Sequence, residues 1–316
     1  MRKWHHANEF LDIKVSAHDT SIFLAETGVI RDGVPCRAIS VFTIPGDKSD
    51  VLSVPKELSI ADSGTTSMFW ESRDSVVTSS SSGLSMYRLD SSSQALSTLR
   101  TLQTESACGG AVADPHHPFT IGFAENRSLS LWDYRTKDVS LKFKTSHFFP
   151  ILSLDANPNL DNVYVTGGAD GRMMFWDVRQ PVGSFPLNWV DAHTHHVTSV
   201  KFHPIHDQLL MTCGTDCGVN LWRFQMISST PKRSKPLVEA ALPPAASAQT
   251  SQRRSSIPVG PVAVLRENDG LIEKFNRHED CVYRGCWSGW VIASAGVNGK
   301  VMFSSVPGAE KYRIML

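Results

Sequence analysis

The segment Ser146–Arg179 reads SHFFPILSLDANPNLDNVYVTGGADGRMMFWDVR, and the segment Ala192–Phe224 reads AHTHHVTSVKFHPIHDQLLMTCGTDCGVNLWRF. Four residue types recur in both at the same offset of 46 positions: His147 and His193, Thr166 and Thr212, Asp170 and Asp216, Trp176 and Trp222. One shared residue could be chance, but four in one register indicate an internal repeat. A period of about 40–45 residues is typical of a β-propeller blade. The repeat therefore predicts an all-β fold, a WD40-type β-propeller.

The four repeated residues can satisfy one another's hydrogen-bonding groups. A His before the first strand can bond the Asp of a turn, a Thr in the second strand can bond the same His, and the Trp indole N–H can reach the Thr hydroxyl. A buried polar network that is fully satisfied stabilises the fold, whereas a partly satisfied one costs more than an apolar core. We therefore interpret both sets as structural tetrads rather than as catalytic groups.

Three weaker copies are indicated upstream of the clear pair. Asn126 stands in the Asp position six residues before Trp132, and a strand is expected at Phe119–Phe123. The segments Ser67–Asp90 and Glu9–Pro45 fit by their strand pattern alone.

A further copy lies near the C-terminus. His278, Ser294 and Asn298 repeat three of the four tetrad positions, but Ser304 replaces the Trp. We expect that network to be incomplete. The chain then shows six recognisable blades.

Composition excludes several classes of protein. Thirty-one basic and 31 acidic residues give a formal net charge of zero, so no broad nucleic-acid footprint is visible. No apolar run approaches the roughly 18 residues needed to span a bilayer, and the N-terminus MRKWHHANEF lacks an apolar segment of a secretory signal. The six cysteines show no framework spacing, so reduced thiols in the cytoplasm are expected.

Two groups of residues could in principle bind zinc. His193, His195 and His196 are closely spaced, but His193 has a tetrad role and no carboxylate or thiolate lies at ligand spacing. The cysteines offer two loosely spaced pairs, Cys213 with Cys217 and Cys281 with Cys286. Because the first pair divides between a strand and a turn, we expect no metal.

Catalytic signatures are lacking in the sequence. Asp133 and Asp177 follow Trp at strand ends, where we expect them to bond nearby backbone. No phosphate-binding loop, nucleophile elbow or nucleotide fingerprint is found. We expect a protein that is not an enzyme, with no cofactor and no small-molecule substrate.

One segment breaks the period. Ser228–Pro261 is rich in Ser, Pro and Ala, with little apolar periodicity, and is expected to be a flexible loop before the last blade. The domain prediction is a single propeller over residues 1–316 with this loop inserted.

Several features together resemble one family of WD-repeat proteins. They are the segment His193–Arg223 with HDQLL at His206–Leu210, the long loop after it, the opening Arg277–Tyr283 of the last blade, and the ending Lys311–Leu316. This pattern resembles the proteins that interact with the EARP and GARP complexes, the endosome-associated recycling and Golgi-associated retrograde tethering complexes. The resemblance runs from about Thr104 to Leu316.

Two departures accompany the resemblance. The family has about one more blade than this chain supplies ahead of Trp4. Three explanations are open: a truncated member with a seventh blade missing at the N-terminus, a misassigned start, or a ring that closes with fewer blades. Family members also carry an acidic stretch in the long loop, whereas this loop is basic and rich in Ser and Pro.

The resemblance implies a scaffold that binds tethering-complex subunits in endosomal recycling and retrograde traffic, peripheral at the trans-Golgi network and endosomes. The alternative is a substrate receptor of a cullin-type ubiquitin ligase. Its motif of the form Trp-Asp-x-Arg fits at Asp133–Arg135 and at Asp177–Arg179. The competing structural explanation for these arginines is a salt bridge between adjacent blades.

Propellers of this type bind partners on the face formed by the loops around the tetrads. Phe148 and Phe149 are two adjacent aromatic residues in such a loop and could anchor a partner helix. The alternative is that one ring packs between blades. The candidate partner-binding residues are Phe148, Phe149, His195, His196, Thr215, Glu279 and Asp280.

Overall fold

The computed structural model describes residues 67–72, 74–90, 95–136, 138–181, 185–227, 269–298 and 300–308, together with the backbone of strands at 10–15, 22–31, 34–43 and 57–58. Its regular structure is β, apart from one short 3-10 helix, η1 (Gln225–Ile227), in this described part. None of the described helical residues forms a helix long and apolar enough to cross a membrane.

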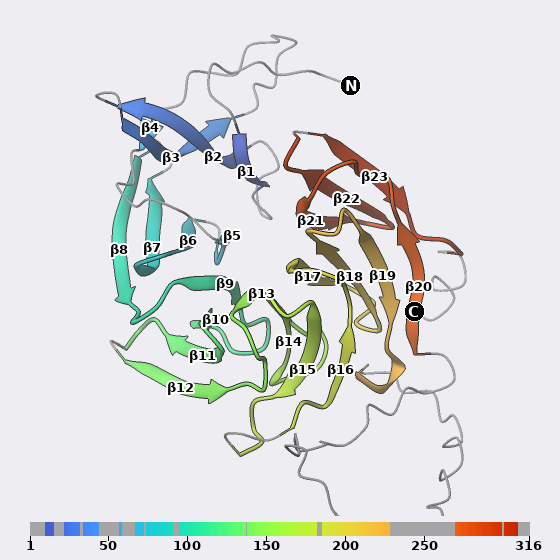
Figure 1. Ribbon diagram of the computed structural model, residues 1–316. Coiled ribbons are helices and arrows are strands. Elements are labelled where there is room, and N and C mark those ends of the chain that lie inside the picture. Colours follow the sequence, from blue (N-terminus) through green and yellow to red (C-terminus); the bar gives the residue numbers. More distant parts are fainter. Residues whose placement is uncertain are drawn as a thin grey trace, which may run out of the picture. The chain divides into compact units, whose positions relative to one another are not determined.

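The strands form six sheets built from antiparallel pairs, and strands that are adjacent in a sheet are consecutive in the chain (Figure 1). The first sheet is β1 (Phe10–Val15), β2 (Ile22–Arg31), β3 (Val34–Thr43) and β4 (Glu57–Leu58). The second is β5 (Ser67–Trp70), β6 (Ser75–Ser80), β7 (Gly83–Asp90) and β8 (Ala95–Gln103). The third is β9 (Cys108–Ala113), β10 (Thr120–Glu125), β11 (Ser128–Asp133) and β12 (Val139–Lys144).

The later sheets follow the same plan. The fourth is β13 (Ile151–Ala156), β14 (Val163–Gly168), β15 (Arg172–Asp177) and β16 (Asn188–Asp191). The fifth is β17 (Val197–Phe202), β18 (Leu209–Gly214), β19 (Val219–Arg223) and β20 (Gly270–Phe275). The last has three strands, β21 (Val282–Ser288), β22 (Val291–Gly296) and β23 (Val301–Ser305). Consecutive small sheets of this kind are the blades of a β-propeller, so the all-β propeller predicted from the repeat is confirmed.

The chain divides into two compact units. One comprises residues 1–156 with 166–170, and the other comprises residues 157–165 with 171–316.

Three of the second strands of the blades, β6, β14 and β18, are buried along their whole length. All six residues of β18 are buried, as are all six of β6. A strand covered on both faces reads as a continuous apolar run rather than as an alternating one. This explains why Leu209–Met211 carries three apolar residues in succession.

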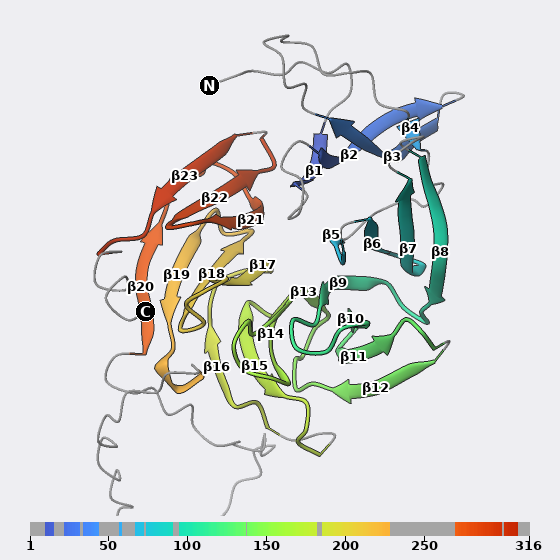
Figure 2. The ribbon, with the colours of Figure 1, turned by 180° about the vertical axis from the view of Figure 1, so that it is seen from behind.

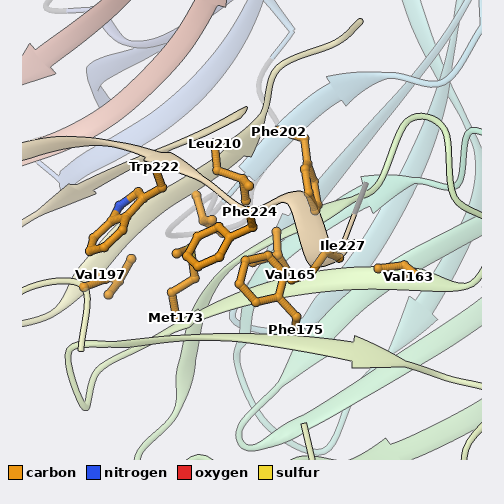
Figure 3. Packing of buried hydrophobic residues seen from close by; sticks show 12 residues of the cluster. Val163, Val165, Met173, Phe175, Val197, Phe202, Leu210, Trp222, Phe224 and Ile227 are labelled. Atoms are coloured by element: carbon orange, nitrogen blue, oxygen red, sulfur yellow. The ribbon is translucent and has the colours of Figure 1, made fainter. Parts of the chain in front are cut away.

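Each unit has an aromatic and aliphatic core between neighbouring strands. In the second unit the ring of Phe175 lies 5.0 Å from that of Phe224 and 6.3 Å from that of Phe202 (Figure 3). In the first unit, Phe123 and Trp132 are each 1% exposed and belong to one cluster with Met86. Such clusters supply the main favourable term in folding.

The structure corrects the bounds of one predicted strand, and two predicted segments lie outside the described residues. The strand expected at Phe119–Phe123 is β10, Thr120–Glu125, because Phe119 has a φ of 73° that a strand residue cannot adopt. The predicted flexible loop Ser228–Pro261 lies outside the described residues, as does the terminal segment Lys311–Leu316.

Candidate interaction surface

One polar network links four residues of the fifth blade. The Trp222 Nε1–H donates to Thr212 Oγ1 at 2.9 Å, and the Thr212 hydroxyl lies 2.8 Å from His193 Nε2. The other ring nitrogen, Nδ1, lies 2.7 Å from Asp216 Oδ1. Because the carboxylate of Asp216 can only accept, the imidazole proton of His193 is on Nδ1. His193 Nε2 then accepts from the Thr212 hydroxyl, so each of the three donors in this network has an acceptor.

The charges in this network are set by burial and pairing. Burial lowers the pKa of His193, although Asp216 acts in the opposite direction. Burial by itself would raise the pKa of Asp216, but the charge and hydrogen bond of His193 and the backbone amides of Gly218 and Thr194 bring it below its ordinary value. The pair therefore consists of a neutral imidazole and a carboxylate at neutral pH.

The first copy makes the same contacts around its histidine. His147 Nδ1 lies 2.9 Å from Asp170 Oδ2, and His147 Nε2 lies 2.7 Å from Thr166 Oγ1. Trp176 is 1% exposed in β15. Its predicted hydrogen bond to Thr166 stays a prediction.

A glycine lies against each His–Asp pair. A Cβ on Gly168 would lie 2.3 Å from Asp170 Oδ1, and one on Gly214 would lie 2.5 Å from His193 Nδ1. Contacts below about 3 Å force a displacement of one partner. Both glycines stand two residues before the Asp in the sequence, a signal that the analysis of the repeat missed.

Each aspartate also holds the loop that leads into the blade. The backbone N–H of Phe148 donates to Asp170 Oδ2 at 3.2 Å, and that of Thr194 donates to Asp216 Oδ2 at 3.3 Å. The loop residue that follows each tetrad histidine is thus tied to the buried network. The tetrads position the loops that carry the candidate partner-binding residues.

Phe148 and Phe149 both lie at the surface of the first unit. Their exposed fractions are 60% and 58%, and the following residue, Pro150, is also exposed. The alternative in which one ring packs between blades is wrong, because the backbone of Phe148 is held by Asp170 while neither ring is buried. Two exposed rings at adjacent positions give this loop an apolar surface.

The other five candidate residues belong to the second unit. His196 and Thr215 exchange two hydrogen bonds, one from the Thr215 N–H to His196 O at 3.0 Å and one from the His196 N–H to Thr215 Oγ1 at 3.1 Å. The Thr215 carbonyl accepts from Cys281 Sγ at 3.3 Å, and the Cys281 N–H donates to Asp280 Oδ1. Glu279 forms an ion pair with Lys300, and His195 is exposed. The structure therefore joins His196, Thr215 and Asp280 on neighbouring blades.

The network of the last blade is less complete than its sequence indicates. His278 Nε2 lies 2.8 Å from Ser294 Oγ, but His278 Nδ1 has no partner among the described residues. The side-chain oxygen of Asn298 instead accepts from the N–H of Lys300 at 3.1 Å. The network thus lacks its Asn contact as well as the Trp that Ser304 replaces.

The arginines of the two Trp-Asp-x-Arg motifs pair locally. Arg135 Nη2 lies 2.6 Å from Asp133 Oδ2, and Arg179 Nη2 lies 2.7 Å from Asp177 Oδ2. The expected salt bridge between adjacent blades is therefore wrong, because each guanidinium folds back on the carboxylate two residues before it. The side chains of Arg135 and Arg179 are 61% and 64% exposed.

Neither zinc alternative is supported by the described residues. Within them, no three His, Cys, Asp or Glu side chains gather closely enough to hold a metal ion. Cys213 is buried in β18, where burial raises the pKa of its thiol to about 12. A thiol in that environment is a poor metal ligand at neutral pH, because the ligand is the thiolate.

Sequence reasoning missed a second exposed apolar segment. Phe185 and Leu187 are 60% and 40% exposed ahead of β16. Unlike Phe148 and Phe149, they are not adjacent in the sequence, so no pair of neighbouring aromatics marked them.

The fold and these polar networks define a β-propeller of the WD type. The profile of a family described as "EIPR1 beta-propeller" matches residues 1–222. The chain belongs to this family. We expected the resemblance to run from about Thr104 to Leu316, whereas the family match begins at residue 1 and ends at residue 222.

Relatives and a solved structure extend this result. "EARP-interacting protein 1" of Caenorhabditis elegans is 34% identical over 211 residues, which cover 65% of this chain and 53% of the relative. The human "EARP and GARP complex-interacting protein 1" is 31% identical over 206 residues, covering 64% of this chain and 50% of the relative. A chain in "Crystal Structure of Mitotic Checkpoint Complex" aligns with a TM-score of 0.64 at 17% identity, covering 96% of this chain and 76% of that one, and shows the fold alone. The chain spans about half the length of the curated relatives it matches.

Proposed function

We propose that this chain is a non-enzymatic scaffold that binds subunits of the EARP and GARP tethering complexes, in the cytoplasm at endosomes and the trans-Golgi network. The observation that carries the proposal is the family match over residues 1–222, together with relatives whose names state an interaction with these complexes. Its architecture in this proposal is one propeller over residues 1–316, with six blades and the segment Ser228–Pro261 as an inserted loop.

Phe148 and Phe149 are the proposed anchor for the partner. Exposed aromatic side chains on a fixed backbone lose little conformational entropy on binding and dominate many interfaces. Here the fixed backbone is the Phe148 amide, which donates to a carboxylate inside the tetrad network. The apolar face of a partner helix fits two adjacent rings.

Substitution of both rings tests the anchor. Phe148→Ala with Phe149→Ala should weaken binding of tethering-complex subunits by about 2 kcal/mol or more, which is roughly a thirtyfold loss of affinity. Co-precipitation from cells and a titration with purified subunits would measure the loss. Circular dichroism and thermal unfolding should match those of the wild type, because neither ring is buried.

A matched control separates a specific loss from a general one. Phe185→Ala removes a ring of the same 60% exposure from the second unit and should leave binding unchanged. Full binding by the folded double variant would place the partner surface elsewhere, for example on His195, His196, Thr215, Glu279 and Asp280.

The alternative function is a substrate receptor of a cullin-type ubiquitin ligase. Its support is the pair of exposed arginines, Arg135 and Arg179, each paired with the aspartate two residues before it. Purification of the native protein with mass spectrometry distinguishes the two functions. Tethering subunits support the scaffold, whereas a cullin adaptor lost on Arg135→Ala with Arg179→Ala supports the receptor.

A further inference from the structure

The last sheet lacks a fourth strand among the described residues. In the preceding blade the third strand, β19, pairs with β18 on one side and β20 on the other. β23 occupies the same third position in its sheet but pairs with β22 alone (Figures 1 and 2).

The burial of β23 departs from that of the other third strands. β11, β15 and β19 each contain four consecutive buried residues. In β23 only Ser304 is buried, while Val301 and Phe303 are 54% and 55% exposed. The side chains of β23 are therefore more exposed than those of β11, β15 and β19, the third strands of the three preceding blades.

The hydrogen-bond pattern shows which backbone groups remain at the open edge. The N–H of Gly296 donates to Lys300 O, and the N–H of Val306 donates to Trp290 O, both at 2.9 Å. Because hydrogen-bonded residues alternate along an antiparallel pair, the groups of Lys300, Met302, Ser304 and Val306 face β22. The N–H and C=O groups of Val301, Phe303 and Ser305 point away from it.

The described part of the chain makes one long contact to this edge, from Arg277 Nη1 to Phe303 O at 3.4 Å. Unpaired strand edges with exposed apolar side chains bind extended chain segments and promote aggregation. The open edge of β23 can therefore accept an extended segment of chain.

We propose that Lys311–Leu316 of the same chain docks on β23 as the fourth strand of the last blade. The chain turns at Pro307–Gly308, where Gly308 has a φ of 66°, a conformation that glycine adopts readily in tight turns. Five residues separate Ser305 from Lys311, the same number that separates β11 from β12. Tyr312, Ile314 and Leu316 would share one apolar face of a strand, and Lys311, Arg313 and Met315 would share the other face.

Hydrogen exchange at the edge amides tests the proposal. In the full chain the amides of Val301, Phe303 and Ser305 should exchange slowly. In a chain that ends at Gly308 they should exchange at least about tenfold faster, while the amides of β18 stay unchanged. The synthetic peptide Ala309–Leu316 should restore slow exchange in the shortened chain, and a peptide of scrambled order should not.

A point variant keeps the test decisive if the shortened chain does not fold. Ile314→Pro removes a backbone donor and should speed the exchange at β23, whereas Ile314→Val should match the wild type. Equal exchange in the full and shortened chains would overturn the proposal. If the shortened chain exchanges slowly only at high protein concentration, a second copy of the chain occupies the edge. That outcome would also overturn the proposal.

Discussion

At the scale of single residues, the tetrad aspartates have two functions in this structure. Asp216 accepts from the imidazole of His193 and from the backbone N–H of Thr194, so it satisfies a buried ring and fixes a surface loop together. The side chain of His193 is fully buried and that of Asp216 is 7% exposed. Removal of the carboxylate leaves the buried imidazole of His193 without an acceptor.

Asp216→Ala should therefore destabilise the protein by about 1–3 kcal/mol for each orphaned buried group. Urea denaturation followed by tryptophan fluorescence measures the change in the free energy of unfolding. Asp191→Ala, at a side chain that is 71% exposed, is the matched control and should change stability by less than about 0.5 kcal/mol. An Asp216→Ala protein as stable as the wild type would contradict the structural role of the tetrad.

At the scale of elements, four aromatic side chains from two neighbouring blades contact one another. The turn after β17 carries His203 and His206, whose ring centroids are 5.1 Å apart. Trp287 lies near the end of β21, and Trp290 lies in the turn between β21 and β22. The ring centroid of Trp290 is 5.0 Å from that of His203 and 4.8 Å from that of His206. Burial, followed by the charge of His206, lowers the pKa of His203 to about 4. Burial also lowers the pKa of His206, with Asp207 acting in the opposite direction.

These histidines predict a loss of stability in acid. Their pKa is lower in the folded protein than the ordinary value of 6.5, so the unfolded chain binds more protons below that pH. The contribution of these two histidines to the free energy of unfolding is complete above pH 6.5. It should fall by about 2 kcal/mol as the pH decreases from 6.5 to 4. Urea denaturation across this range should show a smaller decline for His203→Gln, whereas the exposed control His195→Gln should decline as the wild type does. Equal declines in all three proteins would contradict the assignment.

At the scale of the whole molecule, the proposed single propeller has a consequence for unfolding. The chain divides into two compact units, and each contains its own buried clusters. If residues 1–316 form one domain, both units should unfold together, because blades of one propeller share their packing surfaces.

Calorimetry of the full chain should accordingly show one transition whose calorimetric and van't Hoff enthalpies agree. Fluorescence and circular dichroism should report the same midpoint. Two separate transitions, with Asp216→Ala shifting one of them alone, would show that the units are independent domains.

Much of the element scale could be predicted from the sequence, because a blade is encoded locally. The positions of β14, β18 and β22 follow from short apolar runs ahead of Gly-containing turns. Phe119 shows the limit of this reasoning. Its side chain favours a strand, yet its backbone turns in the left-handed region and its ring lies 5.7 Å from that of Tyr134.

The sequence by itself determined the fold class, because residue types repeated at one offset require the same hydrogen bonds in each blade. It also indicated the family through local motifs. Only the tertiary structure decided that both Phe148 and Phe149 are exposed, and that Arg135 bonds Asp133 instead of a neighbouring blade. It likewise decided that His203 meets Trp290. Each of these facts depends on side-chain directions and on packing between blades. The spacing of residues along the chain predicts neither.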